Sequence, residues 1–259
     1  MTGNLYGVLA PSGGTYGLSP PALRLSNSGT ITGGTWALVS GSTPDTVMNS
    51  GTMIGAVSLG DGADYLDTTA GKIVGVISGG LGADVIKGSA FADAIFGDNV
   101  SGDTTGGADI LYGGFGDDVL TGGYGADILY GNQDNDVLYG NQDNDWLHGG
   151  QGDDLLYGGQ GNDILNGGKG DDVIYGNLGD DTFVVSGAGF GHDVIADFRA
   201  GGANDILQIT TDVFGNFSDL QAHATAVSNG TLLTDAAGDT LLLVGISPDA
   251  LTTAMFVFG

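Results

Sequence analysis

Aspartates recur every nine residues through the middle of this chain, a spacing that suits the repeated binding of a cation. Eight uninterrupted units begin at Gly113 with GGFGDDVLT and end with GNLGDDTFV, and each has Asp at its sixth position and a large apolar residue two places later. A carboxylate in a glycine-rich turn is surrounded by carbonyl oxygens, and this all-oxygen ligand set is the type that Ca²⁺ prefers. The repeated aspartates are Asp118, Asp127, Asp136, Asp145, Asp154, Asp163, Asp172 and Asp181.

The period predicts how these carboxylates are arranged. Six residues of each unit form a turn and three form a short strand, so two units close one coil and alternate aspartates share one side. Coils about 4.8 Å apart bring carboxylates into repulsion of about 1 kcal/mol in water and about 3.5 kcal/mol at an effective dielectric of 20. Cations are therefore expected between the coils, about seven Ca²⁺ ions in all. One expected column holds Asp118, Asp136, Asp154 and Asp172, and the other holds Asp109, Asp127, Asp145, Asp163 and Asp181.

Several units depart from the glycine pattern. Asn132, Asn141 and Asn177 replace the second glycine, and Asp134 and Asp143 replace the glycine at the fourth position. Asn tolerates positive φ better than most residues other than glycine, so these turns are expected to survive. The two aspartates either add ligands to their sites or distort them.

The pattern GGxGxDxUx resembles the haemolysin-type nonapeptide repeats of the repeats-in-toxin (RTX) family of secreted bacterial calcium-binding proteins. The resemblance implies an all-β fold, a parallel β-solenoid that continues into a calcium-binding parallel β-roll with a C-terminal β-rich cap. The repeat register starts at Gly79, which makes Asp84 and Asp93 the first expected metal ligands.

The segment after the roll resembles the one that follows the roll in RTX exoproteins. DTFVV from Asp181 is followed by GHDVIADF and then by NDILQI. In the family, acids of this segment commonly finish the last calcium sites, and the resemblance gives that role here to Asp193 and Asp205.

The sequence before residue 79 has a different period. NSGTI at Asn27 recurs as NSGTM at Asn49, and GKIVG at Gly71 is a weaker third copy. We therefore expect about three coils of a β-solenoid, with roughly 20 residues per coil, over residues 25–78, preceded by an N-terminal cap over residues 1–24. The roll is expected over residues 79–185.

A loop near 97–107 interrupts the expected roll, and residues 186–259 form the last region. Asp98 and Asp103 of the loop are expected to be solvated, with an additional ion as the alternative. In the last region, a helix is expected from Phe217 to Ala226, strands at 231–234 and 240–244, and a helix start at Ser247 with Pro in its first position.

Charge and composition limit the partners. The formal net charge is -26 with only five Lys and Arg, which disfavours nucleic acid and anionic lipid. No apolar run is long enough to span a membrane, no N-terminal signal peptide is recognisable, and there is no cysteine. RTX relatives leave through a type I secretion apparatus that reads an uncleaved C-terminal signal, and the end AMFVFG is similar to such a terminus. These features imply an extracellular or cell-surface location in a bacterium.

No catalytic motif supports an enzyme. HExxH and GxSxG are absent, and the three histidines are not placed with other catalytic groups. The expected role is structural, surface-layer or adhesive, with the chain itself or a cell-surface glycan as partner, and the chain is a whole protein or the C-terminal part of a larger exoprotein. Outward tyrosines of the repeats are either ordinary sheet decoration or a partner surface. The alternative is a polysaccharide-modifying β-helix module, of the epimerase or lyase type.

Overall fold

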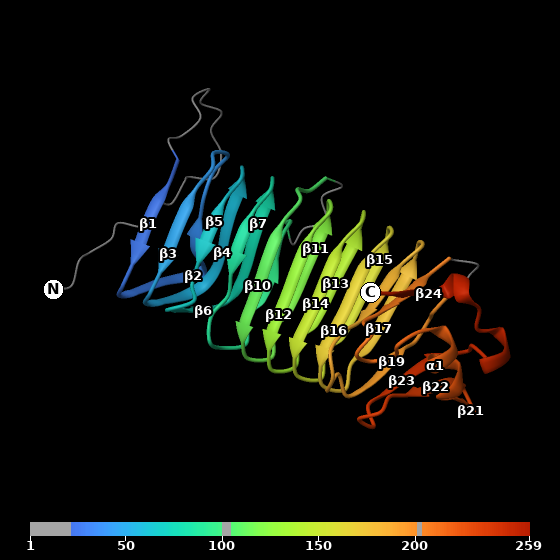
Figure 1. Ribbon diagram of the computed structural model, residues 1–259. Coiled ribbons are helices and arrows are strands. Elements are labelled where there is room, and N and C mark those ends of the chain that lie inside the picture. The colour runs from blue at the N-terminus through green and yellow to red at the C-terminus, as the bar shows by residue number, and fades with distance from the viewer. Residues whose placement is uncertain (1–21, 100–104, 201–203) are drawn as a thin grey trace. The chain divides into compact units, whose positions relative to one another are not determined.

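The computed structural model describes residues 22–99, 105–200 and 204–259, and these residues are almost entirely in β-strands and tight turns. The chain divides into two compact units, one that ends at Ile128 and one that begins at Leu129. Each unit is a parallel β-solenoid in which successive coils add one strand to each of two sheets (Figure 1). The fold is therefore the all-β parallel solenoid and roll that the sequence predicts.

In the first unit, every coil contributes a strand to both sheets. One sheet contains β1 (Arg24–Asn27), β3 (Thr46–Asn49), β5 (Tyr65–Asp67), β8 (Val85–Lys87) and β10 (Ile110–Phe115) in that order. The other contains β2 (Thr30–Val39), β4 (Thr52–Asp61), β7 (Val76–Leu81), β9 (Ala94–Phe96) and β11 (Val119–Tyr124), with β6 (Lys72–Val74) also pairing with β4.

The strand registers confirm the repeats found upstream of residue 79. Thr30 pairs with Thr52, and Thr52 in turn pairs with Lys72, so the three NSGTI-like copies stack in register. Asn27 donates its side-chain amide to Oδ1 of Asn49 at 2.8 Å, and Asn49 donates its own to Oγ1 of Thr68 at 2.9 Å. One corner of these coils is therefore held by a ladder of neutral side chains.

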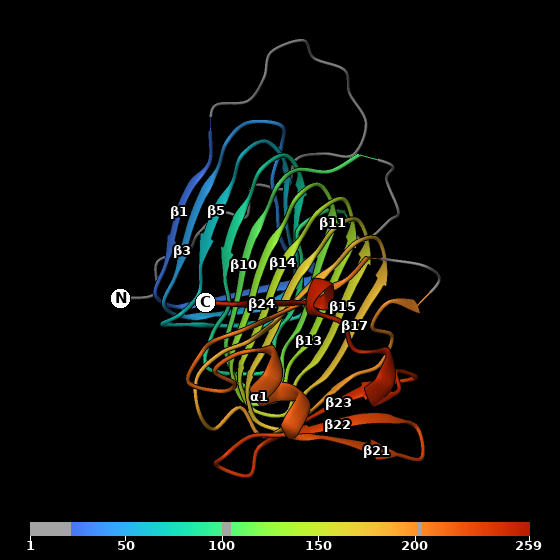
Figure 2. The same ribbon diagram turned by 45° about the vertical axis from the view of Figure 1, so that its right-hand side comes forward.

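In the second unit, the nine-residue period gives equal strands. One sheet contains β12 (Ile128–Gln133), β14 (Trp146–Gln151), β16 (Ile164–Lys169), β18 (Thr182–Val185), β20 (Ile206–Ile209) and β24 (Phe256–Phe258). The other contains β13 (Val137–Gln142), β15 (Leu155–Gln160), β17 (Val173–Leu178), β19 (His192–Ile195), β23 (Thr240–Val244), β22 (Gly230–Thr234) and β21 (Ala224–Val227). Figure 2 shows β13, β15 and β17 side by side.

The core is a column of aliphatic side chains from the eighth position of each repeat. Leu138, Leu147, Leu156 and Leu165 are fully buried, whereas the flanking seventh and ninth positions are at least partly exposed. Strand alternation explains this pattern, because neighbouring side chains in a strand point to opposite faces. Burying one face of each sheet against the other leaves the turns at the coil corners to be stabilised by other means.

The C-terminal segment differs in part from the prediction. The expected strands are present as β22 and β23, but α1 covers only Phe217–Ala222. Residues 224–227 instead form β21, which pairs antiparallel with β22, so sheet hydrogen bonds replace the last helical turn. The helix start at Ser247 is only a three-residue 3-10 turn, η2 (Pro248–Ala250), and a second one follows as η3 (Thr253–Met255). The N-terminal cap expected over 1–24 lies almost wholly outside the described residues.

Candidate metal centre

The aspartates of the second unit stand at the two corners of each coil and are linked from coil to coil. The backbone N–H of Asp136 donates to Oδ1 of Asp154 at 2.7 Å, and that of Asp154 donates to Oδ1 of Asp172 at 2.8 Å. The same contact repeats along both corners. One column contains Asp136, Asp154, Asp172 and Asp193, and the other contains Asp145, Asp163, Asp181 and Asp205.

The first unit has the same arrangement. The N–H of Asp84 donates to Oδ1 of Asp109, and that of Asp93 donates to Oδ1 of Asp118, at 2.8 and 2.7 Å. One column contains Asp45, Asp64, Asp84, Asp109 and Asp127, and the other contains Asp93 and Asp118. Every aspartate that the sequence marks as a metal ligand therefore lies in one of these columns.

Several of these carboxylates keep one buried oxygen without a donor. Oδ1 accepts the ladder hydrogen bond, or in Asp93 Oδ2 accepts the N–H and hydroxyl of Ser89, but the other oxygen has no hydrogen-bond partner among the described residues, although the side chains are no more than 5% exposed. An uncompensated buried charge costs several kcal/mol, so such an oxygen must bind a cation or a proton. These oxygens are Oδ2 of Asp64, Asp84, Asp109, Asp154, Asp163 and Asp172, and Oδ1 of Asp93.

The pKa values show the cost of this burial. Desolvation raises the pKa of Asp84 and Asp154 from 3.8 to about 8. The ladder hydrogen bond lowers these pKa values, and the charges of neighbouring carboxylates raise them further. Desolvation also raises the pKa of Asp109 to about 7 and that of Asp163 and Asp172 to about 6. Without a cation, the columns would therefore hold protons close to neutral pH.

A backbone carbonyl oxygen lies beside the uncompensated oxygens of Asp84, Asp109, Asp154 and Asp163. A Cβ added to Gly149 would overlap Oδ2 of Asp154 and lie 2.5 Å from the carbonyl oxygen of Gly167 in the next coil. A Cβ at Gly158 would likewise overlap Oδ2 of Asp163 and lie 2.7 Å from the carbonyl oxygen of Gly176. Only glycine leaves this space open, which explains why the first position of the repeat is glycine.

The donor set fits calcium. Among the described residues, no three His, Cys, Asp or Glu side chains converge on one point, so an ion at a coil corner would take most of its ligands from backbone carbonyls. Carboxylate and carbonyl oxygens without nitrogen or sulfur suit a hard cation with six to eight ligands. When bound, Ca²⁺ would supply the positive charge that the buried carboxylates require.

The turns have the backbone conformation that the sequence departures require. Asn132 and Asn141 have φ values of 84° and 83°, and Asp134 and Asp143 both have 72°. These residues occupy the left-handed region that glycine occupies in the other repeats, such as Gly150 at 125°. The expected survival of the turn at Asn132, Asn141 and Asn177 is therefore confirmed.

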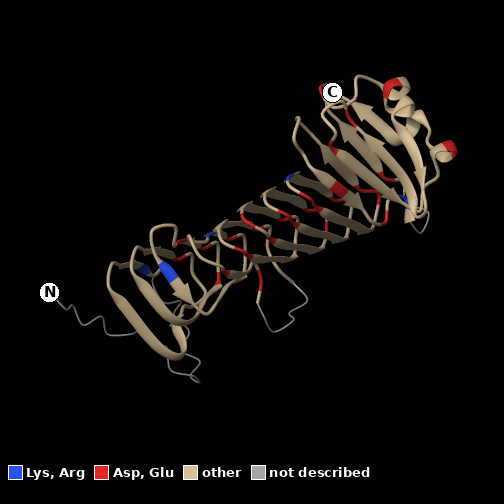
Figure 3. Cartoon of the chain, turned by 90° about the horizontal axis from the view of Figure 1, so that it is seen from below, with Lys and Arg blue, Asp and Glu red and all other residues tan. Residues whose placement is uncertain are grey.

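The repeat geometry matches a known family. The family model of the "RTX calcium-binding nonapeptide repeat (4 copies)" matches residues 76–99, 103–138, 130–165, 139–174 and 157–195. Residues 76–195 are an RTX calcium-binding region. The ladders of Asp84 to Asp205 lie in this RTX region or directly after it, and Figure 3 shows the acidic positions following its turns. Because RTX repeats bind calcium, the expected cofactor is confirmed in kind.

Other comparisons add little to this assignment. No curated protein matches the chain. Among solved structures, the chain is similar to the extracellular lipase LipA from Serratia marcescens, with 19% identity, a TM-score of 0.32 and 89% of this chain covered. The chain covers 42% of the length of that lipase chain. Among the residues that the structure describes, no helix is long and apolar enough to cross a bilayer.

The two acids at the C-terminal ends of the columns differ from each other. Asp193 accepts the N–H of Asp172 and is 4% exposed, and burial raises its pKa to about 8, as for the internal acids. Asp205 accepts the N–H of Asp181 at 3.0 Å and the N–H of Arg199 at 2.5 Å, so protein donors reach both of its oxygens. The total of about seven ions remains a prediction.

Sequence reasoning did not identify Asp45 and Asp64 as members of a column. The spacing of 19 and 20 residues to the next acid and the segment GDGAD at Gly60 were the available signals. The coil of Asp64 nevertheless differs from the RTX coils, because the first turn position is the fully buried Leu59 where Asp84 has Gly79. In Asp45, Oδ1 accepts the N–H of Leu23 and Oδ2 accepts the hydroxyl of Ser40.

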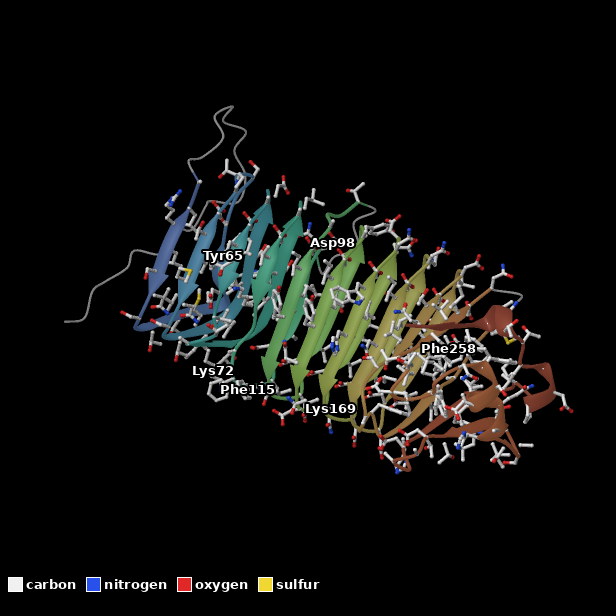
Figure 4. The ribbon with its side chains drawn as sticks, viewed as in Figure 1. Tyr65, Lys72, Asp98, Phe115, Lys169 and Phe258 are labelled. Atoms are coloured by element: carbon white, nitrogen blue, oxygen red, sulfur yellow. The ribbon has the colours of Figure 1, made fainter. Side chains whose placement is uncertain are left out.

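The prediction that Asp98 is solvated is wrong. Asp98 is 7% exposed, and its Oδ2 accepts the N–H of Tyr124 at 2.6 Å (Figure 4). Its charge also contributes to the raised pKa of Asp84 and Asp109. Asp98 is buried because the coil closes over it, a tertiary effect that the composition of the loop does not reveal. Asp103 lies outside the described residues.

A second, exposed ladder runs outside the aspartate column. Oδ1 of Asn135 accepts the N–H of Asp153, Oδ1 of Asp153 accepts that of Asp171, and Oδ1 of Asp171 accepts that of His192. Asn135, Asp153 and Asp171 occupy the fifth position of their repeats, which is Asp or Asn in every unit except that of Ala126. Asn can replace Asp there because only Oδ1 accepts the ladder hydrogen bond, and the other terminal atom of the side chain faces solvent. This exposed ladder is therefore a natural control for the buried one.

Proposed function

We propose that this chain is a secreted bacterial RTX protein that folds on Ca²⁺ outside the cell and has a structural, surface-layer or adhesive role. The observation that supports the proposal is the stacking of buried carboxylates, such as Asp154 and Asp163, that each lack a hydrogen-bond donor for one oxygen. Where a metal site exists only in the fold, metal binding and folding share one free energy. The chain would then stay unfolded where calcium is scarce.

Circular dichroism tests this proposal. We expect the spectrum of a largely disordered chain in chelator and of β structure in millimolar calcium, with magnesium much less effective because it demands compact octahedral geometry. Unchanged β content after exhaustive chelation would contradict the proposal.

Export would follow from the same property. An unfolded chain suits a type I secretion apparatus, and we propose that the last region, including β24, contains the signal that this apparatus reads. Deletion from Leu251 onward should abolish export without blocking synthesis. Export that persists after this deletion, but fails after removal of residues 1–24, would reverse the assignment. The activity of a larger exoprotein could lie in segments beyond this chain.

The outer face of the second unit supports a role in contact rather than turnover. The rings of Tyr139, Tyr157 and Tyr175 stack with centroids 5.1 and 4.9 Å apart and planes within 3° and 13° of parallel. Such a regular, flat ladder suits another copy of the chain or an extended surface. Replacing Tyr157 and Tyr175 by Ser should reduce calcium-dependent oligomers or surface attachment without changing the calcium midpoint of folding. A protein that stays monomeric and unattached at high calcium would remove this role.

The polysaccharide-modifying alternative has one supporting observation. On the outer face of the first unit, the hydroxyl of Tyr65 lies 3.2 Å from Oδ2 of Asp67, and Nζ of Lys87 lies 5.6 Å from the Tyr65 ring centroid and 5.9 Å from that of Tyr112. Tyrosine, lysine and carboxylate groups together could abstract a proton from an acidic sugar. Cleavage or epimerisation of an acidic polysaccharide by the purified, calcium-loaded chain would favour this alternative.

A further inference from the structure

One coil of the second unit breaks the pattern of its outer face and borders a depression. In this sheet the seventh repeat position is Ile128 and Ile164 in the neighbouring coils, but Trp146 between them. The ninth position is His148, where the next coil has Asn166. A depression of about 230 Å³ lies at this coil. Its lining residues are Tyr130, Asn132, His148, Gly149, Gly150 and Gln151.

The depression combines aromatic surface with polar groups. Trp146 packs edge-on against Tyr130, with ring centroids 5.3 Å apart, and keeps 37% of its surface exposed. The centroid of the His148 ring lies 6.2 Å from that of Tyr130. Asn132 and Gln151 add side-chain amides, which can both donate and accept hydrogen bonds. Aromatic walls with a few convergent polar groups are the usual composition of a small-molecule site.

His148 is not explained by packing alone. Its Nδ1 is buried and has no hydrogen-bond partner among the described residues. A buried polar atom without a partner is costly, so this histidine is not kept for stability. Because Nδ1 is covered by protein atoms, only the rest of the ring can face a molecule in the depression. Burial also lowers the pKa of His148, which keeps the imidazole neutral near pH 7. A neutral ring offers one donor and one acceptor rather than a charge.

We propose that this depression binds one uncharged sugar ring, a neutral hexose unit of a glycan. A pyranose has an apolar C–H face that can lie against Tyr130, which Trp146 supports edge-on, and hydroxyl groups that can pair with the His148 ring and the amides. The formal charge of -26 disfavours an anionic ligand in the same place. The inference rests on the proposed calcium-folded state, because β12 and β14 form the depression only as neighbours in a stacked coil.

Saturation-transfer NMR on the calcium-loaded full chain tests the proposal with glucose, galactose, mannose and N-acetylglucosamine as probes. Two variants use residues that the repeat already accepts in these columns: Trp146→Ile and His148→Asn. Leu155→Val, which introduces the residue found at Val137 and Val173 in the adjacent coils of the other sheet, is the matched control. At least one hexose should bind saturably, and each site variant should weaken binding by roughly tenfold while the control retains it.

Circular dichroism of the same samples separates the possible failures. β structure in calcium without saturable binding of any hexose overturns the sugar site and leaves the proposed function intact. Equal binding by wild type and both site variants also overturns the sugar site. Binding of galacturonate that is tighter than that of every neutral hexose overturns it as well. So does an NMR change at the Trp146 indole that follows protein concentration rather than sugar concentration. A chain that gains no β structure in calcium contradicts the proposed function and the sugar site together.

Discussion

One corner of the solenoid changes its chemistry within the first unit. In the early coils it is built from Asn27, Asn49 and Thr68, and in later coils Asp93 and Asp118 hold the corresponding corner. The side-chain amide of Asn49 accepts a hydrogen bond from Asn27 and donates one to Thr68. The side chains of the neutral ladder therefore supply hydrogen-bond partners for one another. A carboxylate can only accept, and in Asp93 one oxygen accepts the N–H and hydroxyl of Ser89 and leaves the other to a cation.

The difference separates a self-sufficient corner from a metal-dependent one. Neutral groups that pair with each other need no further partner, whereas stacked carboxylates repel and remain desolvated. We therefore expect the early coils to keep local order in the absence of calcium and the RTX region to lose it. We give four predictions, from the largest expected effect to the smallest.

The largest effect is expected where a buried acid is removed. Asp154→Ala deletes a proposed calcium ligand and leaves the buried N–H of Asp136 without its acceptor, which costs about 1–3 kcal/mol in addition to the lost metal binding. The calcium midpoint measured by circular dichroism should rise by roughly tenfold or more. Asp153→Ala, one residue away in the exposed ladder, is the control and should leave the midpoint nearly unchanged. Equal shifts in the two variants would contradict the distinction between the ladders.

The neutral corner can be given the chemistry of the acidic one. Asn49→Asp removes the donor to Thr68 and buries a carboxylate that has no acidic neighbour in this column, at a cost of about 2–4 kcal/mol. The loss should appear in urea unfolding and should not be recovered at high calcium. If calcium restores stability, the early corner can form a metal site and the contrast between the two corners disappears.

The pH dependence should have opposite signs with and without calcium. The folded-state pKa of Asp154 is about 8 against 3.8 for an ordinary Asp, so the metal-free fold binds more protons than the unfolded chain between these values. Stability in chelator should therefore be greatest at low pH and should fall as pH rises from about 4 to about 8. In calcium, protons compete with the ion, so the calcium midpoint should rise as pH falls. Stability in chelator that increases with pH would contradict the burial of these acids.

The smallest effect is expected at the boundary coil. Asp64→Asn keeps an acceptor for the N–H of Asp45 and removes an uncompensated charge in a coil whose first turn position is the buried Leu59 rather than glycine. Stability in chelator should increase by about 1 kcal/mol or less, with little change in the calcium midpoint. Asp84→Asn, whose coil has Gly79, is the comparison and should raise the midpoint clearly. A large rise for Asp64→Asn would extend the calcium columns beyond the RTX region.

The sequence was informative wherever a local rule repeats. The nine-residue period predicted the two corner columns and the left-handed turns at Asn132, because each follows from positions that recur in every coil. It failed where a distant contact decides the outcome. Asp98 is buried by the coil that closes over it, residues 224–227 pair as a strand with β22, and Asp45 has its second oxygen satisfied by Ser40.

Hydrogen exchange resolved by residue tests most directly the central claim that one corner depends on calcium and the other does not. The N–H groups of Asp136 and Asp154 donate to carboxylates of the RTX region, and the N–H of Ser50 donates to the carbonyl of Asn27 at the neutral corner. After transfer from calcium to chelator, Asp136 and Asp154 should exchange at the rate of an unfolded chain, while Ser50 should keep measurable protection. Equal protection of all three amides in chelator, or complete loss at Ser50 together with the others, would contradict this account.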